Sequence, residues 1–268
     1  MRRALLLALA VLALPSSAAA QDHTAQSGAV SATLSATGQL TIARAGAVLF
    51  SGPLCAEGCS ASRRETWDPL VVADFDGDGE PEVTASLHTG GAHCCYVEHT
   101  FTLVGAAYVQ ITHDFADPGA LVRDLNRDGQ PEFVSGDARL AGAILRVTRL
   151  PYAAAAPPVQ IWRLRDGRLV DATRRYRKQV RADARRWWSG YTGYRSTRGG
   201  PKLAMLGAWA ADQYRLGRRR HALRVLRRER RRGHLRQVDH FTGRDVGGKR
   251  YVRKLDRTLR RHGYARRR

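Results

Sequence analysis

The sequence contains little lysine, cysteine or methionine. Among 268 residues there are 4 cysteines and 2 methionines, and only four of the 45 basic residues are lysines. It also contains no GxxxxGK[ST] loop, no GxSxG motif and no HExxH motif, so it shows none of the commonest signatures of nucleotide hydrolases, serine hydrolases and zinc peptidases. With 43% hydrophobic residues the chain is neither disordered as a whole nor an integral membrane protein. Its length allows one or two domains with hydrophobic cores.

Long apolar runs are also missing, except at the start of the chain. Ala4 to Leu14 is apolar, follows Arg2-Arg3, and precedes three small residues that end at Ala20. This order is typical of a secretory signal peptide, and the run is too short to cross a bilayer as a helix. The alternative is an uncleaved N-terminal anchor. We expect residues 1–20 to be a signal peptide, and the mature protein to be secreted or extracytoplasmic, with no transmembrane span after its removal.

Acidic residues become scarce in the second part of the chain. Residues 21–171 contain 11 basic and 18 acidic residues, whereas residues 172–268 contain 32 basic and 6 acidic residues. Such asymmetry indicates two physically different regions. The first attracts cations and the second attracts polyanions.

The hydrophobic periodicity changes at the same place. Before residue 171, short alternating segments predict strands, and Asp166-Gly167 is a strong hairpin signal. After it, apolar residues recur every three to four positions and predict helices. We therefore predict an α+β protein, with a β-domain at 21–171 and an Arg-rich helical domain at 172–268. The expected strands are 30–34, 40–44, 47–50, 82–87, 132–135, 160–164 and 168–172, and the helices begin near residues 176, 203, 222 and 252.

An acidic loop occurs twice, fifty residues apart. The segments DFDGDGEPE and DLNRDGQPE share the pattern D-x-[DN]-x-D-G-x-P-E. Oxygen ligands at positions 1, 3 and 5, a glycine at position 6, a main-chain carbonyl at 7 and a carboxylate at 9 can surround one hard cation, and an all-oxygen set suits Ca²⁺. The candidate ligands are Asp74, Asp76, Asp78, the Glu80 carbonyl and Glu82 in the first loop, and Asp124, Asn126, Asp128, the Gln130 carbonyl and Glu132 in the second.

These loops are not EF-hands, because position 12 is Ala85 or Ser135 and Pro81 and Pro131 oppose a following helix. A loop of this kind followed by a strand resembles the calcium loop of FG-GAP/VCBS repeats, the blades of integrin-α-like propellers. The resemblance covers residues 69–87 and 120–137. It implies blade-like antiparallel hairpins clipped by calcium in an exported protein, and it does not imply catalysis. Two repeats are too few for a closed propeller. The alternative is a pair of polar turns that bind nothing.

The four cysteines all lie in the predicted β-domain. An even number of cysteines in an exported chain indicates disulfides. Because a bond between adjacent residues is strained, we expect Cys55 and Cys59 to pair with Cys94 and Cys95, in an order that the sequence leaves open. The alternative is a soft-metal site or a Cys-His nucleophile built from the cysteines and the nearby histidines His88, His93 and His99.

Basic runs such as residues 218–220 and 227–232 are interleaved with tryptophan and tyrosine in the helical region. Arginines can bind phosphates and aromatic rings can stack on bases, but export argues against a genomic target. An anionic extracellular or cell-envelope polymer is the more plausible partner. The simplest alternative is that the arginines are solvated charge with no dedicated partner.

Taken together, these patterns predict an exported calcium-binding protein of structural or interaction type, with no catalysis expected. Two alternatives stay open. The basic helices bind a polyanion, or the acidic loops serve a metal-dependent hydrolase with His88 or His113 as its base.

Overall fold

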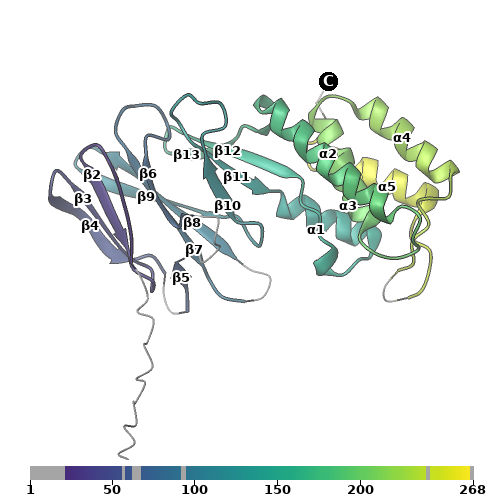
Figure 1. Ribbon diagram of the computed structural model, residues 1–268, viewed down its shortest axis with the longest axis horizontal. Coiled ribbons are helices and arrows are strands. Elements are labelled where there is room, and N and C mark those ends of the chain that lie inside the picture. Colours follow the sequence, from purple (N-terminus) through teal and green to yellow (C-terminus); the bar gives the residue numbers. More distant parts are fainter. Residues whose placement is uncertain (1–21, 56–57, 62–67, 92–94, 240–241, 266–268) are drawn as a thin grey trace, which may run out of the picture.

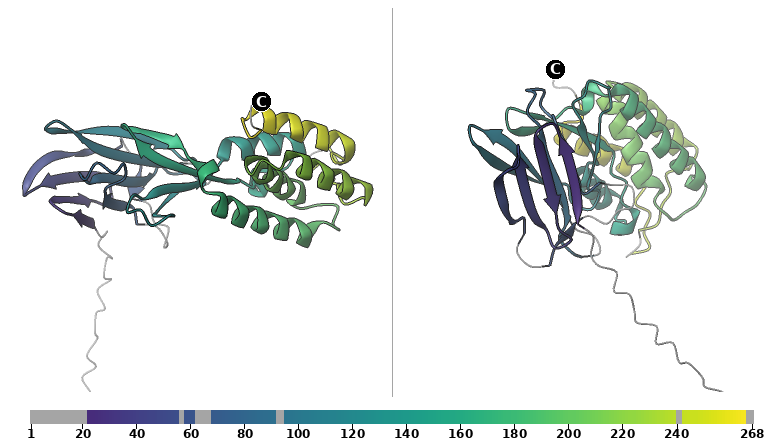
Figure 2. Two further views of the ribbon diagram at one scale, coloured as in Figure 1. Left: turned by 90° about the horizontal axis from the view of Figure 1, so that it is seen from above. Right: turned by 60° about the vertical axis from the view of Figure 1, so that its left-hand side comes forward.

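The computed structural model describes residues 22–55, 58–61, 68–91, 95–239 and 242–265, so the predicted signal peptide at 1–20 lies outside the described residues. Antiparallel sheets form one end of an elongated molecule and helices form the other (Figures 1 and 2). This confirms the predicted α+β class with strands first and helices last. In the part of the chain that is described, every helix is too short or too polar to span a bilayer.

The sheets follow one another along the chain, and every strand pairing is antiparallel. The first sheet has the order β1 (His23–Ser27), β2 (Val30–Leu34), β3 (Gln39–Arg44) and β4 (Ala47–Pro53). The second has the order β5 (Ser60–Ala61), β7 (Glu82–His88), β8 (Tyr96–Val104) and β9 (Ala107–Asp114), with β6 (Leu70–Ala73) also paired to β7. The third has the order β10 (Ala120–Arg123), β11 (Glu132–Gly136), β12 (Val159–Arg165) and β13 (Arg168–Asp171). The expected strands are all present.

The second sheet lies between the other two. Alternating residues of β2 and β3, such as Val30 and Ile42, form one hydrophobic core with Val83 and Phe101 of the second sheet. A second core joins the second and third sheets and is built largely from the rings Phe75, Phe115, Phe133 and Trp162. Because both faces of β7 are covered, its residues Glu82–Leu87 are buried without alternation.

The helices form a separate hydrophobic core. They are α1 (Ala138–Thr148), α2 (Arg177–Tyr194), α3 (Lys202–Arg215), α4 (Arg219–Arg231) and α5 (Gly248–Arg261), with short 3₁₀ turns at Tyr152–Ala154 and Thr173–Arg175. The four expected helices correspond to α2, α3, α4 and α5. The central one is α3, which is buried along its whole length.

Helix α1 was not expected, because its residues lie inside the region assigned to strands. Asp137 caps it by accepting a hydrogen bond from the Leu140 N–H, and the apolar face packs into the helical core. A Cβ on Gly207 of α3 would lie 3.0 Å from the Ile144 side chain, so a residue without a side chain allows α1 to approach closely. The chain thus enters the helical core after β11 and returns to the third sheet for β12 and β13.

The expected disulfide pairing is wrong. Cys55 is bonded to Cys59 across a local turn, so these two residues do not pair with Cys94 and Cys95. Their Cα atoms are 6.5 Å apart, inside the range that a disulfide spans. Cys95 is also disulfide-bonded, and Cys94 lies outside the described residues. The expectation rested on the strain of a bond between the adjacent residues Cys94 and Cys95, and it overlooked that Cys55 and Cys59, four residues apart, can bond to each other.

Candidate metal centre

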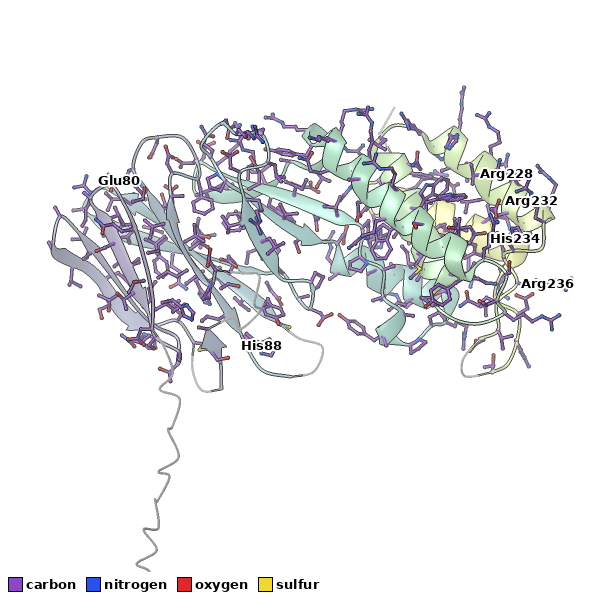
Figure 3. All side chains as sticks on the ribbon, in the orientation of Figure 1. Glu80, His88, Arg228, Arg232, His234 and Arg236 are labelled. Atoms are coloured by element: carbon purple, nitrogen blue, oxygen red, sulfur yellow. A yellow bond between two sulfur atoms is a disulfide. The ribbon has the colours of Figure 1, made fainter. Side chains whose placement is uncertain are left out.

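The two acidic loops connect equivalent strands of neighbouring sheets, β6 to β7 and β10 to β11. They lie against each other, because a Cβ on Gly77 in the first loop would collide with the Gln130 side chain of the second. Figure 3 labels Glu80 in the first loop and His88 at the opposite end of β7. The loops therefore occupy one end of the sheets.

The first loop curls around its own carboxylates. Asp74 accepts hydrogen bonds from the N–H groups of Gly77 at 2.6 Å and Gly79 at 3.1 Å, and Asp78 accepts from Glu80 N at 2.8 Å. Gly79 at position 6 has φ +90°, the left-handed region that favours glycine. One carboxylate oxygen from each of Asp74, Asp76 and Asp78 lies within 4.8 Å of the other two. The loop thus brings together the carboxylates expected at positions 1, 3 and 5.

The two remaining candidate ligands of the first loop, Glu80 and Glu82, make different contacts. The Glu80 side chain turns away to form a bidentate ion pair with Arg44 at 2.8 and 2.9 Å, so only its main-chain carbonyl is left for a cation. Glu82 is 1% exposed and accepts a hydrogen bond from Phe75 N at 2.8 Å. Burial raises the pKa of Glu82 to about 7, and the three aspartates add to the rise. Negative charge in this loop is therefore concentrated and poorly compensated.

The second loop has the same backbone plan. Asp124 accepts hydrogen bonds from Arg127 N at 2.6 Å and Gly129 N at 3.0 Å, and Glu132 accepts from Leu125 N at 2.9 Å. Its position 3 is Asn126, whose amide donates to Asp128 at 2.7 Å. Only two of its carboxylates therefore stand at positions 1, 3 and 5, against three in the first loop.

A guanidinium group offsets the negative charge of the second loop. Arg163 of β12 donates to the side chain of Gln130, and its nitrogens lie 3.4 Å from Asp128 and 3.6 Å from Glu132. Burial alone would raise the pKa of Asp128, but hydrogen bonds from Asn126 and the Gln130 N–H, together with Arg163, lower it. The side chain of Glu132 is fully buried and also accepts a hydrogen bond from the Tyr176 hydroxyl.

The strand registers make the contrast between the loops direct. Phe133 pairs with Trp162, so Glu132 stands opposite Arg163 at the next position along the strands. Val83 pairs with Phe101, so Glu82 stands opposite Thr102, whose hydroxyl lies 3.4 Å from the Glu82 carboxylate. The glutamate at position 9 of the loop therefore faces a cation, Arg163, in the third sheet and a neutral hydroxyl, that of Thr102, in the second sheet. The donor set of the first loop fits a hard divalent cation, whereas the second loop already holds a positive charge.

Sequence reasoning did not identify Arg163. Alternation along β12 puts it on the same face as Ile161, which is fully buried. A charged residue at an inward position of a strand predicts a buried partner of opposite charge. This pattern was the sequence signal that could have identified Arg163. A buried carboxyl at Glu98, whose pKa burial raises to about 7, was also not expected. Thr84 donates a hydrogen bond to it at 2.6 Å.

The alternative site built on cysteines and histidines is not assembled in the described residues. Cys95 is in a disulfide, and His93 and Cys94 lie outside the described part of the chain. The His88 ring packs against Tyr96, whereas His99 is buried and its Nδ1 lies 2.7 Å from the Gln110 amide. The proposed base His113 packs against the rings of Phe115 and Trp162.

A second acidic cluster lies where helices α2 and α3 meet β12. Asp183 accepts hydrogen bonds from Val159 N at 2.7 Å and from the Trp187 indole at 2.9 Å. Asp212 beside it is fully buried, and neither of its oxygens accepts a hydrogen bond from the described residues. Burial and the neighbouring Asp183 raise the pKa of Asp212 well above its ordinary value, although the positive charge of Arg215 opposes the rise. A protonated Asp212 can donate to the Asp183 carboxylate.

We expect Asp212→Asn to make the protein more stable than the parent chain as the pH rises. The folded pKa of Asp212 is raised, so the stability linked to its proton is present at acid pH and is lost as the pH climbs from the ordinary carboxyl range towards the folded pKa. Asparagine is neutral throughout and avoids that loss. Urea unfolding between pH 4 and 9 measures the difference, which should be smallest at acid pH. Asp256→Asn is the control. Hydrogen bonds from Arg219 and Tyr214 outweigh burial and lower the pKa of Asp256, so its contribution is present above the ordinary carboxyl pKa and is lost only at more acid pH; this variant should lose a nearly constant amount of stability over most of the range. A constant effect of Asp212→Asn across this range would contradict the assignment.

Comparison with known proteins gives two partial matches. A probable thylakoid lumen protein of Synechocystis sp. is 35% identical over 108 residues, which cover 39% of this chain and 30% of the relative. An uncharacterised protein of Sinorhizobium fredii is 31% identical over 148 residues, which cover 51% of this chain and 22% of the relative. The chain thus spans less than a third of each of these relatives. No family model matches it, and no solved structure matches it significantly.

Proposed function

We propose that this chain is an exported protein in which Ca²⁺, bound at the first acidic loop, stabilises a β-sheet scaffold of structural or interaction type. The observation that carries the proposal is the convergence of Asp74, Asp76 and Asp78 in a loop whose buried glutamate faces Thr102. In the second loop the corresponding glutamate faces Arg163. In the second loop the guanidinium of Arg163 offsets the negative charge of the carboxylates, and in the first loop Ca²⁺ from solution would do so.

Two further features support the proposal. The sheets are successive antiparallel meanders with acidic loops at equivalent connections, as the resemblance to FG-GAP/VCBS blades implies. Export is supported by the signal-like N-terminus and by the partial relative whose name places it in the thylakoid lumen. Bound calcium would be held by Asp74, Asp76, Asp78, the Glu80 carbonyl and Glu82. It would act by cancelling the mutual repulsion of these carboxylates, which fixes the hairpin β6–β7 against the neighbouring sheet.

Calcium is expected to raise the melting temperature of the oxidised mature chain above its value in EDTA. Extracellular calcium sites often have a Kd of about 10⁻⁴ to 10⁻³ M, so 10 mM calcium should add about 1.4 to 2.7 kcal/mol. For a chain of this size that corresponds to a rise of about 3 to 10 °C. Differential scanning calorimetry measures it directly.

A matched pair of variants tests which loop is responsible. Asp78 and Asp128 occupy the same position, and each accepts the N–H group two residues further on, at 2.8 and 3.0 Å. Asp78→Asn should abolish most of the calcium-dependent rise, whereas Asp128→Asn should preserve it. An equal loss in both variants would assign calcium to both loops. If a folded chain melts at the same temperature in calcium and EDTA, the loops are polar turns and the proposal fails.

A further inference from the structure

A pocket of about 610 Å³ lies among the helices, far from the acidic loops. Its floor is α3, with Trp209 and Gln213, and its walls come from α2 and α4. Figure 1 shows these three helices in the part of the molecule away from the sheets. Trp188 of α2 packs against Trp209 with ring centroids 5.0 Å apart. The volume falls within the range of about 300 to 1,000 Å³ that is typical of sites for small ligands.

The rim of this pocket is strongly basic on two sides. Arg181 and Arg185 project from α2, one turn apart, while Arg218 immediately precedes α4 and Arg228 lies in its last turn; all four are exposed. Figure 3 labels Arg228 at the far end of the molecule from the sheets. Arg181, Arg185 and Arg218 form no ion pair with the described residues. Guanidinium groups with free donors at both edges favour a ligand that carries carboxylate, sulfate or phosphate.

The floor contains a polar group without a partner. Gln213 is 7% exposed and lines the pocket, and its side-chain carbonyl accepts no hydrogen bond from the described residues. That oxygen is itself closed to solvent, and a buried acceptor left unpaired is destabilising. A rotation of the Gln213 side chain towards the pocket that it lines would let a ligand donate a hydrogen bond to it. Beside it, the indole of Trp188 and the side chains of Ala184 and Val225 offer an apolar surface.

We propose that this pocket binds an acidic carbohydrate, a sugar ring that carries a carboxylate. Such a ring has an apolar C–H face for the indole, hydroxyl groups that can donate to Gln213, and a carboxylate for the arginines at the rim. This goes beyond the calcium site and rests on different residues. It also narrows the expectation of an anionic envelope polymer, by giving that polymer a specific site instead of a diffuse basic surface.

The chemistry of the walls favours a sugar over an acidic peptide. The pocket is built from three helices, whose backbone groups are already hydrogen-bonded within each helix. An extended peptide laid on this floor would find no main-chain partners for its own N–H and C=O groups, apart from the Gln213 side chain. The hydroxyls of a sugar stay solvated at the open side of the pocket.

Calorimetric titration of the mature chain with trigalacturonate, at physiological salt and without added calcium, tests this proposal. Trigalacturonate should bind, whereas the neutral trisaccharide maltotriose should not. Arg181→Gln combined with Arg185→Gln should weaken binding at least about tenfold. The control is Arg253→Gln combined with Arg257→Gln, which removes the same charge at the same spacing from an exposed face of α5, outside the pocket. Gln213→Leu should weaken binding by about three- to tenfold without lowering the melting temperature, because its acceptor has no partner to lose.

Three results would overturn the proposal. The first is no heat of binding with trigalacturonate up to about 100-fold molar excess over the protein. The second is an equal loss in the two double variants, which would show that surface charge alone attracts the sugar. The third is tighter binding of hexaglutamate than of trigalacturonate, which would assign the pocket to acidic peptides. None of these results bears on the calcium-dependent melting, so the two proposals can fail independently.

Discussion

Arg163→Met is expected to destabilise the protein by about 3 to 5 kcal/mol, as the loss of one member of a buried ion pair typically does. The side chain of Arg163 is 9% exposed, and that of its cross-strand partner Glu132 is fully buried. Methionine fills much of the same volume but leaves this carboxylate and that of Asp128 without their positive charge. Urea unfolding at neutral pH measures the change.

Arg165→Met is the matched control, because Arg165 is on the same strand and is exposed. We expect it to change the free energy of unfolding by less than about 0.5 kcal/mol. Adding Glu132→Gln to Arg163→Met should recover part of the lost stability, since the orphaned charge is then absent. If Arg163→Met costs no more than Arg165→Met, the guanidinium does not compensate the second loop, and the contrast between the loops loses its basis.

Arg215→Met is the second substitution for which we expect a loss of about 3 to 5 kcal/mol. Arg215 ends α3, is 6% exposed, and donates a hydrogen bond to the Val159 carbonyl of β12. Its guanidinium lies 3.9 Å from the buried carboxylate of Asp137, 3.6 Å from the partly exposed Asp171 and 4.3 Å from the centre of the Tyr264 ring. One side chain thus ties α3 to the third sheet and to the end of the chain.

Chemical denaturation followed separately by circular dichroism and by tryptophan fluorescence tests the role of Arg215. We expect the parent chain to unfold in one transition by both probes, and the variant to unfold at lower denaturant. Arg227→Met, at an exposed position on α4, should change little. Coincident, unshifted transitions in Arg215→Met would show that packing alone joins the helices to the sheets.

The sequence predicted those elements whose patterns are local. Hairpins such as the one around Asp166-Gly167 carry their own turn signal, and helices such as α5 have a regular apolar stripe. Helix α1 was missed because its apolar residues are numerous and its length is only 11 residues. A short apolar segment of this kind fits a buried strand as well as a helix. The N-cap residue Asp137 was the sequence signal that favoured a helix over a strand.

The candidate site was predictable only in part, because only some of its features are local in the sequence. The spacing of Asp74, Asp76 and Asp78 is a property of one loop, and the structure brings their carboxylates together as expected. What distinguishes the two loops is the residue opposite the final glutamate, and this depends on strand register. Thr102 lies 20 residues from Glu82, and Arg163 lies 31 residues from Glu132. Without the pairing of the strands, the repeats looked equivalent.

The position of α1 in the chain means that the helical end of the protein is not a separable module. Leu140 and Ile144 are part of the same hydrophobic core as α3 and α5, yet they are encoded before β12 and β13. A fragment that begins at residue 172 would therefore lack one wall of its own core and would expose the apolar side of α3. A cut at the change in charge, which looks natural in the sequence, would divide a single folding unit. The β12–β13 hairpin lies between α1 and α2 in the chain, so we expect the third sheet and the helices to unfold together.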